Sequence, residues 1–174
     1  MSGRPSPQPV RVIQELYQDY NEIGHKQALA ELDSAFGESC PHIVIEPTRI
    51  GDETMRWIAV GNCLHKSTVL SGAAALLCVA VLPDRWYVWT PLAASSTVTF
   101  AIYTLLWQTD PCCKYQVERN PETLASLDIS NISRHSVVVL TYKDDWRRRL
   151  LHSGVFLLAV GVVGVRLYDL LADT

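Results

Sequence analysis

Apolar residues are concentrated in two uncharged stretches, residues 67–82 and 88–107. Only residues 83–87 separate them, and this connection is too short to hold a domain. At about 1.5 Å of rise per residue, residues 67–82 give a helix of about 24 Å and residues 91–107 one of about 25 Å, both slightly less than a hydrocarbon core of about 30 Å. The pattern therefore predicts a transmembrane helical hairpin over residues 67–107.

A third apolar segment, residues 150–171, follows the basic run Arg147-Arg148-Arg149. Its uncharged part ends before Arg166, whose long side chain is able to snorkel to the far interface. Such a short segment either spans the bilayer or forms an interfacial or re-entrant helix. The pattern favours a third span.

The region before the hairpin consists of a proline-rich arm followed by a segment with amphipathic spacing. Residues 1–10 are rich in proline and predict a disordered arm, with a mitochondrial presequence as the alternative. Residues 11–66 form a water-facing region in which apolar positions up to Phe36 recur at helical intervals, so we expect one or two amphipathic helices that end at Gly37.

Two further elements are predicted before residue 67. Residues 42–45 have the composition of a short strand. We expect a turn at Gly51 and Asp52, with Asp52 as the N-cap of a helix that continues to Pro83. A second helix is expected to begin with Thr90 as N-cap and Pro91 at the first position.

The loop region, residues 108–149, predicts one strand over residues 136–142. The fold class is thus mainly α and membrane-embedded: a helical transmembrane hairpin plus a third apolar helix, with a small mixed α/β part that faces water.

Charge is segregated along the chain. Nearly all ionisable residues lie in residues 1–66 and 108–149, and the net charge is −3. There is no polybasic tail, so we expect no nucleic-acid partner. Basic residues flank the spans on the side of the N-terminal region and the central loop, which places both on one face of the membrane and the hairpin tip on the other.

Small residues recur every four positions in both spans and predict helix–helix packing by close backbone approach. The aromatic residues of the hairpin tip and Trp107 at the far end are expected at the two headgroup levels. The predicted packing residues are Ser67, Ser71 and Ala75 in the first span and Ala93, Thr97 and Ala101 in the second.

The sequence shows no catalytic, cofactor or metal signature. Neither of the first two spans contains an ionisable residue, which argues against ion-coupled transport. Cysteines and histidines lack the paired spacing of a zinc site, and His25, His135 and His152 are interpreted as surface residues. Two alternatives remain: a metal- or redox-sensing membrane protein that uses Cys63, His65, Cys112 and Cys113, and a pore built by oligomers.

Several blocks of the chain resemble the transmembrane protein 11 family, mitochondrial morphogenesis proteins of animals. They are IVIEPTRIGDET at residues 43–54, RW at 56–57 with VGNCLHK at 60–66, WQ at 107–108 with DPCCKYQVE at 110–118, VVL at 138–140, KDD at 143–145 and RLLH at 149–152. The resemblance covers about residues 40–152.

The resemblance implies a non-enzymatic, multi-pass mitochondrial membrane protein that shapes mitochondria and cristae. It further implies self-association, and association with the mitochondrial contact site and cristae organising complex. The inner membrane is favoured and the outer membrane is the alternative. We expect a partner-binding face, packed from two segments of the chain, that contains Glu46, Arg49, Asp52, Arg56, Asp110, Lys114 and Glu118.

Overall fold

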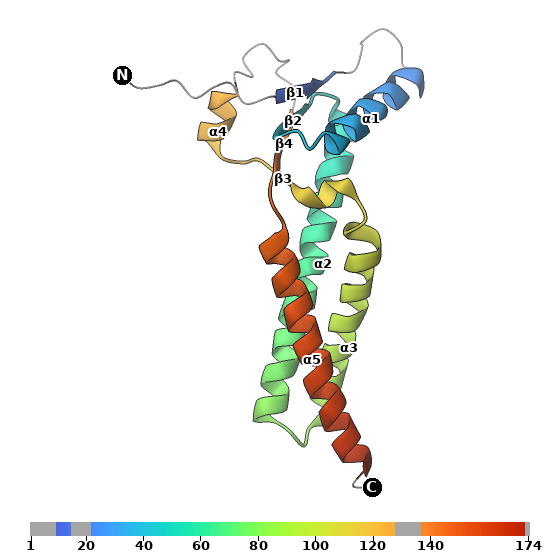
Figure 1. Cartoon of the computed structure of the whole chain (residues 1–174), viewed down its shortest axis with the longest axis vertical. Coiled ribbons are helices and arrows are strands. Elements are labelled where there is room, and N and C mark those ends of the chain that lie inside the picture. The colour runs from blue at the N-terminus through green and yellow to red at the C-terminus, as the bar shows by residue number, and fades with distance from the viewer. Residues whose placement is uncertain (1–9, 15–21, 128–136, 173–174) are drawn as a thin grey trace, which may run out of the picture. The chain divides into compact units, whose positions relative to one another are not determined.

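The structure is a computed structural model that describes residues 10–14, 22–127 and 137–172. It is mostly helical with one small mixed sheet, as predicted (Figure 1). In chain order the elements are β1 (Val10–Ile13), α1 (Glu22–Gly37), β2 (His42–Ile45), α2 (Thr48–Val81), α3 (Trp86–Ile102), the π-helical turn η1 (Tyr103–Trp107), the 3₁₀ turn η2 (Pro111–Lys114), β3 (Tyr115–Val117), α4 (Pro121–Ser126), β4 (Val138–Tyr142) and α5 (Trp146–Ala172).

The chain divides into two compact units. The sheet unit takes Met1–Ile58 and Pro111–Lys143, and the helical unit takes Ala59–Asp110 and Asp144–Thr174. Helix α2 contributes residues to both, so the predicted boundary between residues 66 and 67 lies inside a continuous helix.

The sheet unit is built on a four-stranded sheet in the order β1-β2-β4-β3. Strand β1 pairs in parallel with β2, while β4 is antiparallel to both β2 and β3. Central strand β2 buries three successive residues, Ile43, Val44 and Ile45, because both of its faces are covered. The predicted strands at residues 42–45 and 136–142 are confirmed within the described residues, since β4 begins at Val138.

The helical prediction for the N-terminal region is wrong at its start. Residues Val10–Ile13 form a strand, in which the β-branched Val10, Val12 and Ile13 fit a pleated surface. Parallel pairing with β2 provides hydrogen-bond partners for the backbone of β1. The spacing of apolar residues in the sequence does not reveal this pairing. Of the predicted disordered arm, residues 1–9 lie outside the described residues and Val10 begins β1.

Helix α1 ends at Gly37, as predicted, in a Schellman motif whose left-handed residue is Ser39. The backbone N–H of Cys40 donates to the Ala35 carbonyl at 3.2 Å, and that of Ser39 donates to Phe36 at 3.1 Å. Ser39 has φ of 52°, whereas no described glycine has a positive φ. This turn directs the chain from α1 into β2.

The predicted turn at Gly51 and Asp52 is also wrong, because α2 begins at Thr48 and passes through both residues. Gly51 instead marks a close approach of α2 to the sheet. A Cβ at this position would lie 2.9 Å from Cγ2 of Val138 in β4. As predicted, the helix then continues without a break to the residues before Pro83.

The second helix begins earlier than predicted. Arg85 is the N-cap residue of α3, and Pro91 lies inside the helix rather than at its first position. The turn between α2 and α3 is closed by hydrogen bonds from the Arg85 N–H to the Leu82 carbonyl and from the Val88 N–H to Arg85. Inside the helix Pro91 cannot donate the hydrogen bond that an ordinary residue would make.

Within the helical unit, α3 and α5 pack against each other and α3 contacts the second half of α2 (Figure 1). One hydrophobic core cluster of the unit consists of Ala75, Val79, Trp89, Ala93 and Val163. Trp89 and Trp107 are 0% and 1% exposed, so protein surrounds these two rings, and their predicted place at headgroup level stays a prediction. Trp86 and Tyr87 are each 55% exposed.

Two helices among the described residues are long and apolar enough to cross a membrane, Arg49–Val81 and Trp146–Ala172. Only 22% of the apolar window of the first is buried, and 11% of that of the second. The predicted second span is not among them, because α3 has 17 residues before it passes into η1.

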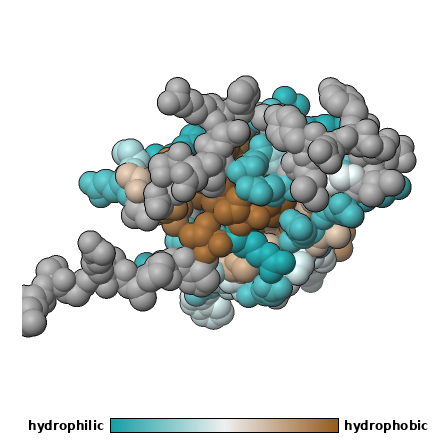
Figure 2. All heavy atoms as spheres, turned by 90° about the horizontal axis from the view of Figure 1, so that it is seen from above, coloured by the Kyte–Doolittle hydropathy of each residue, from teal (hydrophilic) through white to brown (hydrophobic). Residues whose placement is uncertain are grey.

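The two units differ in how far they expose large hydrophobic side chains. In the sheet unit the most exposed of these are Val12, Leu29, Trp57 and Tyr142, at 36–39%. In the helical unit Leu70, Leu77, Leu157 and Leu158 are 62–68% exposed. The face drawn in Figure 2 has hydrophobic residues at its centre with hydrophilic residues around them.

Candidate functional site

Six of the seven residues of the predicted partner-binding face belong to the sheet unit, and Asp110 belongs to the helical unit. Arg49, Asp52, Arg56 and Lys114 are exposed, while Glu46 and Glu118 are half-buried. Glu46 accepts a hydrogen bond from Gln14 Nε2 at 3.3 Å. The four exposed side chains are therefore the part of this face that a partner can reach.

Arg49, a charged residue of the predicted face on α2, pairs with a residue outside that face. Arg49 Nε lies 3.2 Å from Glu53 Oε1, one helical turn further along, and both side chains are largely exposed. Within the described part of the chain, Asp52 and Arg56 form no ion pair. Such an exposed pair contributes little to stability, so Arg49, Asp52 and Arg56 are not needed to hold the fold together.

Glu118 has a structural role at the edge of β3. Its carboxylate accepts hydrogen bonds from the backbone N–H groups of Arg119 and Asn120 and from the hydroxyl of Thr141 in β4. The Asn120 N–H is the largest cause that holds the pKa of Glu118 below its ordinary value, against a smaller opposing effect of burial. The carboxylate thus fixes the turn into α4.

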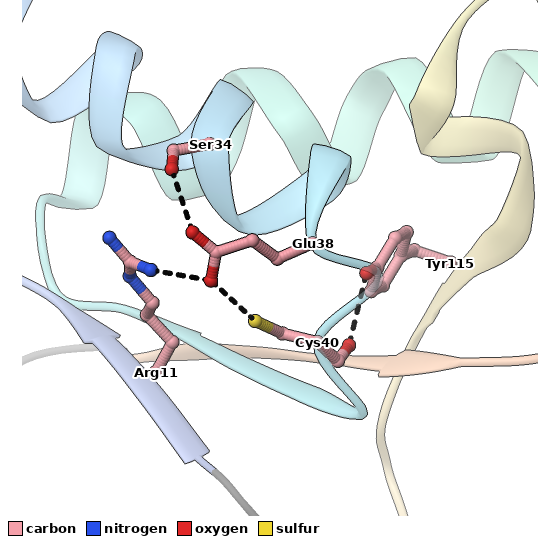
Figure 3. Close-up of polar contacts among 5 residues, drawn as sticks. All are labelled: Arg11, Ser34, Glu38, Cys40 and Tyr115. Atoms are coloured by element: carbon pink, nitrogen blue, oxygen red, sulfur yellow. Dashed lines mark hydrogen bonds and ion pairs between the residues drawn. The ribbon is translucent and has the colours of Figure 1, made fainter.

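A second polar cluster of the sheet unit surrounds Glu38, directly after α1 (Figure 3). Its Oε2 accepts a hydrogen bond from Arg11 in β1 at 2.8 Å and lies 4.0 Å from Cys40 Sγ. Its Oε1 accepts from Ser34 Oγ at 3.1 Å. The carboxylate therefore joins α1, β1 and the turn before β2, and the Schellman turn at Ser39 places it there.

Tyr115 ties the start of β3 to the same turn. Its hydroxyl donates to the Cys40 carbonyl at 3.0 Å (Figure 3). Its ring packs against Phe36 of α1 with centroids 5.0 Å apart. Burial raises the pKa of Tyr115 to about 12, with smaller contributions from Cys40, Tyr142 and Cys112. Neither Glu38 nor Tyr115 stands out in the sequence, because Arg11 lies 27 residues from Glu38 and Cys40 lies 75 residues from Tyr115.

The raised pKa of Tyr115 predicts sensitivity to alkali. The contribution of Tyr115 is present below the ordinary pKa of about 10 and is lost as pH rises through about 12, because the folded state holds the phenol proton more tightly. We expect Tyr115→Phe to weaken this alkaline transition and to lower the free energy of unfolding at neutral pH by about 1 kcal/mol. Denaturant unfolding as a function of pH measures both effects.

Tyr142→Phe is the matched control, because it removes the hydroxyl of the exposed neighbour whose ring packs edge-on against Tyr115. This variant should keep the alkaline transition of the wild type. An identical transition in Tyr115→Phe and the wild type would contradict the role of the buried phenol.

The cysteines and histidines of the metal or redox alternative are not assembled into a site. Cys63 and His65 belong to the helical unit, whereas Cys112 and Cys113 are buried in η2 of the sheet unit. No group of three or more His, Cys, Asp or Glu residues among the described residues is placed to hold a metal ion. No observation supports this alternative.

The helical unit contains a histidine–aromatic cluster that the sequence did not reveal. His152, predicted at the surface, is fully buried on α5. Its ring lies 4.2 Å from that of Tyr103, 5.0 Å from Phe100 and 5.5 Å from His65, between centroids. The π-helical turn η1 places both Tyr103 and Trp107 towards the interior of the unit.

The contact between α2 and α3 uses small polar residues. Ser96 Oγ donates to the Thr68 carbonyl at 3.0 Å, and the Thr68 hydroxyl donates to Thr99 at 2.9 Å. Gly72 lies beside Ser96, so that a Cβ there would be 3.0 Å from Ser96 Oγ. Close approach of small residues is thus present, although it centres on Thr68, Gly72 and Ser96.

The predicted packing residues differ in how far their side chains are buried. Ala75 and Ala93 are buried in the core of the helical unit, and Ser67 and Ser71 are half-buried. Thr97 and Ala101 are exposed. A four-residue interval drifts around a helix of 3.6 residues per turn, which is why one stripe does not stay on the contact line.

Known proteins provide an independent comparison. The sequence profile of the mitochondrial morphogenesis regulator family matches residues 9–168. The chain belongs to this family. The match extends beyond the resembling blocks in both directions, to the region before β1 and almost to the end of α5.

Several relatives in the family are similar over most of their length. The chain is 43% identical over 163 residues to transmembrane protein 11, mitochondrial, of Danio rerio, covering 92% of this chain and 86% of the relative. It is 41% identical over 163 residues to the human protein of that name, covering 92% and 84%. For transmembrane protein 11-A, mitochondrial, of Xenopus laevis, identity is 44% over 161 residues, covering 91% and 85%. No solved structure matches the chain.

Proposed function

We propose that this protein is a non-enzymatic membrane protein of mitochondria that organises mitochondrial shape and cristae. The helical unit inserts into the bilayer, and the sheet unit faces water and binds protein partners. Its membership of the mitochondrial morphogenesis regulator family supports the process. The names of its relatives, mitochondrial transmembrane proteins, support the location.

The observation that carries the membrane assignment is the exposure of the apolar helices. The core helix of a soluble protein is mostly buried, whereas the apolar windows of α2 and α5 are 22% and 11% buried. Hydroxyl groups in α2, α3 and η1 also donate to backbone carbonyl groups of the same helical segment. Thr97, Thr104 and Ser71 each donate to the carbonyl four residues earlier, as expected where no water is at hand.

We further propose three crossings, with α3 as the second. Helix α3 and η1 together run from Trp86 to Trp107 and carry no Asp, Glu, Lys, Arg or His, although α3 alone is shorter than a typical span. The sheet unit would then lie on one side of the membrane and the C-terminus on the other. The inner mitochondrial membrane is favoured by the family resemblance alone, and self-association and contact with the cristae organising complex rest on the same ground.

The proposed partner-binding face predicts that a charge reversal within it changes mitochondrial shape without affecting folding or membrane insertion. We expect Arg49→Glu to alter mitochondrial shape while the protein still folds and inserts, because Arg49 is exposed and its ion pair with Glu53 contributes little. The measurement is mitochondrial morphology in cells in which the variant replaces the wild type, together with resistance of the protein to alkaline carbonate. In the variant we expect wild-type carbonate resistance.

Arg119→Glu provides a matched charge reversal in the sheet unit. Arg119 is exposed and lies outside the predicted face, so its reversal should leave morphology unchanged. If Arg49→Glu supports normal morphology at normal abundance, the proposed face is wrong. Extraction of the wild-type protein by carbonate would instead overturn the membrane assignment.

A further inference from the structure

One end of the helical unit carries basic side chains that lack acidic partners. Arg148, in the first turns of α5, donates to the Asn62 amide oxygen of α2 at 2.5 Å. Lys66 lies one turn further along α2 from Asn62 and is exposed, on the same side of the helix. The contact therefore brings the charges of Arg148 and Lys66 to one level of the unit.

The acids beside this cluster are already engaged. Asp145 pairs with Arg149 at 2.6 Å, and Asp144 caps α5 by accepting from the Trp146 N–H at 3.1 Å. In the described ranges, Lys66 and Arg147 form no ion pair, and Arg148 has only the neutral amide of Asn62. The positive end of the α5 dipole adds to this charge, since cations are unfavourable near a helix N-terminus.

The composition of this site favours an anion over a metal cation. His65 is next to Lys66 in sequence, and its ring lies 5.5 Å from that of His152. Two imidazoles would suit a metal, but two uncompensated cations and no available carboxylate oppose it. An oxyanion instead accepts hydrogen bonds from guanidinium and ammonium groups.

Apolar side chains begin directly beside the charges. Leu70, one turn beyond Lys66 on α2, is 68% exposed, and Leu151, three residues beyond Arg148 on α5, is 51% exposed. A ligand that fits both surfaces has an anionic head and a hydrocarbon chain. We propose that Lys66 and Arg148 bind the phosphate of an anionic phospholipid, whose acyl chain lies along Leu70 and Leu151.

This inference rests on the proposed insertion of the helical unit into a bilayer. It adds a specific lipid site at the level where the apolar parts of α2 and α5 begin. The phosphate neutralises the charge that no described carboxylate neutralises, and Asn62 positions Arg148 to receive it. The site would link the lipid composition of the membrane to the packing of α2 against α5.

The test uses the full-length protein in phosphatidylcholine vesicles that contain spin-labelled phosphatidylglycerol or spin-labelled phosphatidylcholine. The relative association constant of the two labelled lipids is measured for the wild type and for Lys66→Gln/Arg148→Gln. We expect the preference of the wild type for phosphatidylglycerol to fall about fivefold or more in the double variant, since the bound phosphate loses a charge-assisted hydrogen bond at both positions. Glutamine at position 148 keeps a donor for Asn62.

The control variant is Arg85→Gln/Arg166→Gln, which removes two basic residues of the same unit and gives the same net charge. It should retain the wild-type preference. An equal loss of preference in both double variants, or no loss in either, would overturn the lipid site.

Two further measurements distinguish a lipid site from a site for soluble phosphate and from a failure of membrane insertion. Excess inorganic phosphate at constant ionic strength should leave the labelled lipid bound, and its displacement would assign the site to a soluble phosphate. Flotation of each protein with pure phosphatidylcholine vesicles reports insertion alone. A wild type that fails to float overturns the proposed membrane function, whereas floating proteins without lipid preference overturn only this inference.

Discussion

Leu158→Arg is expected to reduce insertion of α5 into a membrane about a hundredfold. Leu158 lies near the middle of Trp146–Ala172 and is 62% exposed, so lipid surrounds it if the helix spans. Arginine at the centre of a span costs about 3 kcal/mol on the scale of translocon insertion, and each 1.4 kcal/mol is about tenfold. In water the same exchange at an exposed position would change stability by about 0.5 kcal/mol at most.

The measurement is translocation of a glycosylation tag at the C-terminus of the full-length chain, translated with microsomal membranes. Leu29→Arg is the control, because Leu29 is an exposed hydrophobic residue of α1 in the sheet unit and is 39% exposed. We expect this variant to translocate its C-terminus as the wild type does. Equal translocation of Leu158→Arg and Leu29→Arg would show that α5 is not surrounded by lipid.

Gly61→Ala is expected to lower the stability of the helical unit by about 2 kcal/mol. A Cβ at Gly61 would lie 2.2 Å from Cε2 of Trp107, a contact that requires the indole to move. Trp107 is 1% exposed and therefore has little room to move. Overpacking of this kind costs about 1–3 kcal/mol, which exceeds the gain of up to about 1 kcal/mol from the better helix propensity of alanine.

Thermal unfolding of the detergent-solubilised protein measures this effect. Gly164→Ala is the matched control on α5, because a Cβ there meets nothing within 4 Å, and it should be neutral or slightly stabilising. Gly72→Ala should fall between the two, since its nearest contacts are 3.0 Å away. Rescue of Gly61→Ala by Trp107→Phe would show that the two positions are coupled. Equal stability of Gly61→Ala and Gly164→Ala would contradict the contact.

The corrections to the helix and strand predictions share one cause. Val12 and Ile13 fit a helical repeat and a strand equally well, and the parallel pairing with β2 decides between them. Asp52 is a good N-cap residue by type, but α2 has already begun at Thr48. Local preferences of about 1 kcal/mol are readily outweighed by tertiary packing.

Some residues of the candidate sites can be predicted from the sequence and others cannot. The exposed charges Arg49, Asp52 and Arg56 follow from their surroundings in the sequence. The network around Glu38 joins positions 11, 38, 40 and 115, and no local pattern marks residues so far apart. The burial of His152 also depends on Tyr103 and Phe100, which reach it only when α3 packs against α5.

The sequence alone determined that most of the chain is helical, that apolar helices long enough for a bilayer are present, and which family the chain resembles. These properties depend on the composition of contiguous segments, because the cost of burying charge in lipid is summed along one helix. The tertiary structure alone decided the strand order, the left-handed turn at Ser39 and the fit of Gly61 against Trp107. Each of these depends on which distant residues meet, and their packing is specified by shape and hydrogen bonding rather than by periodicity.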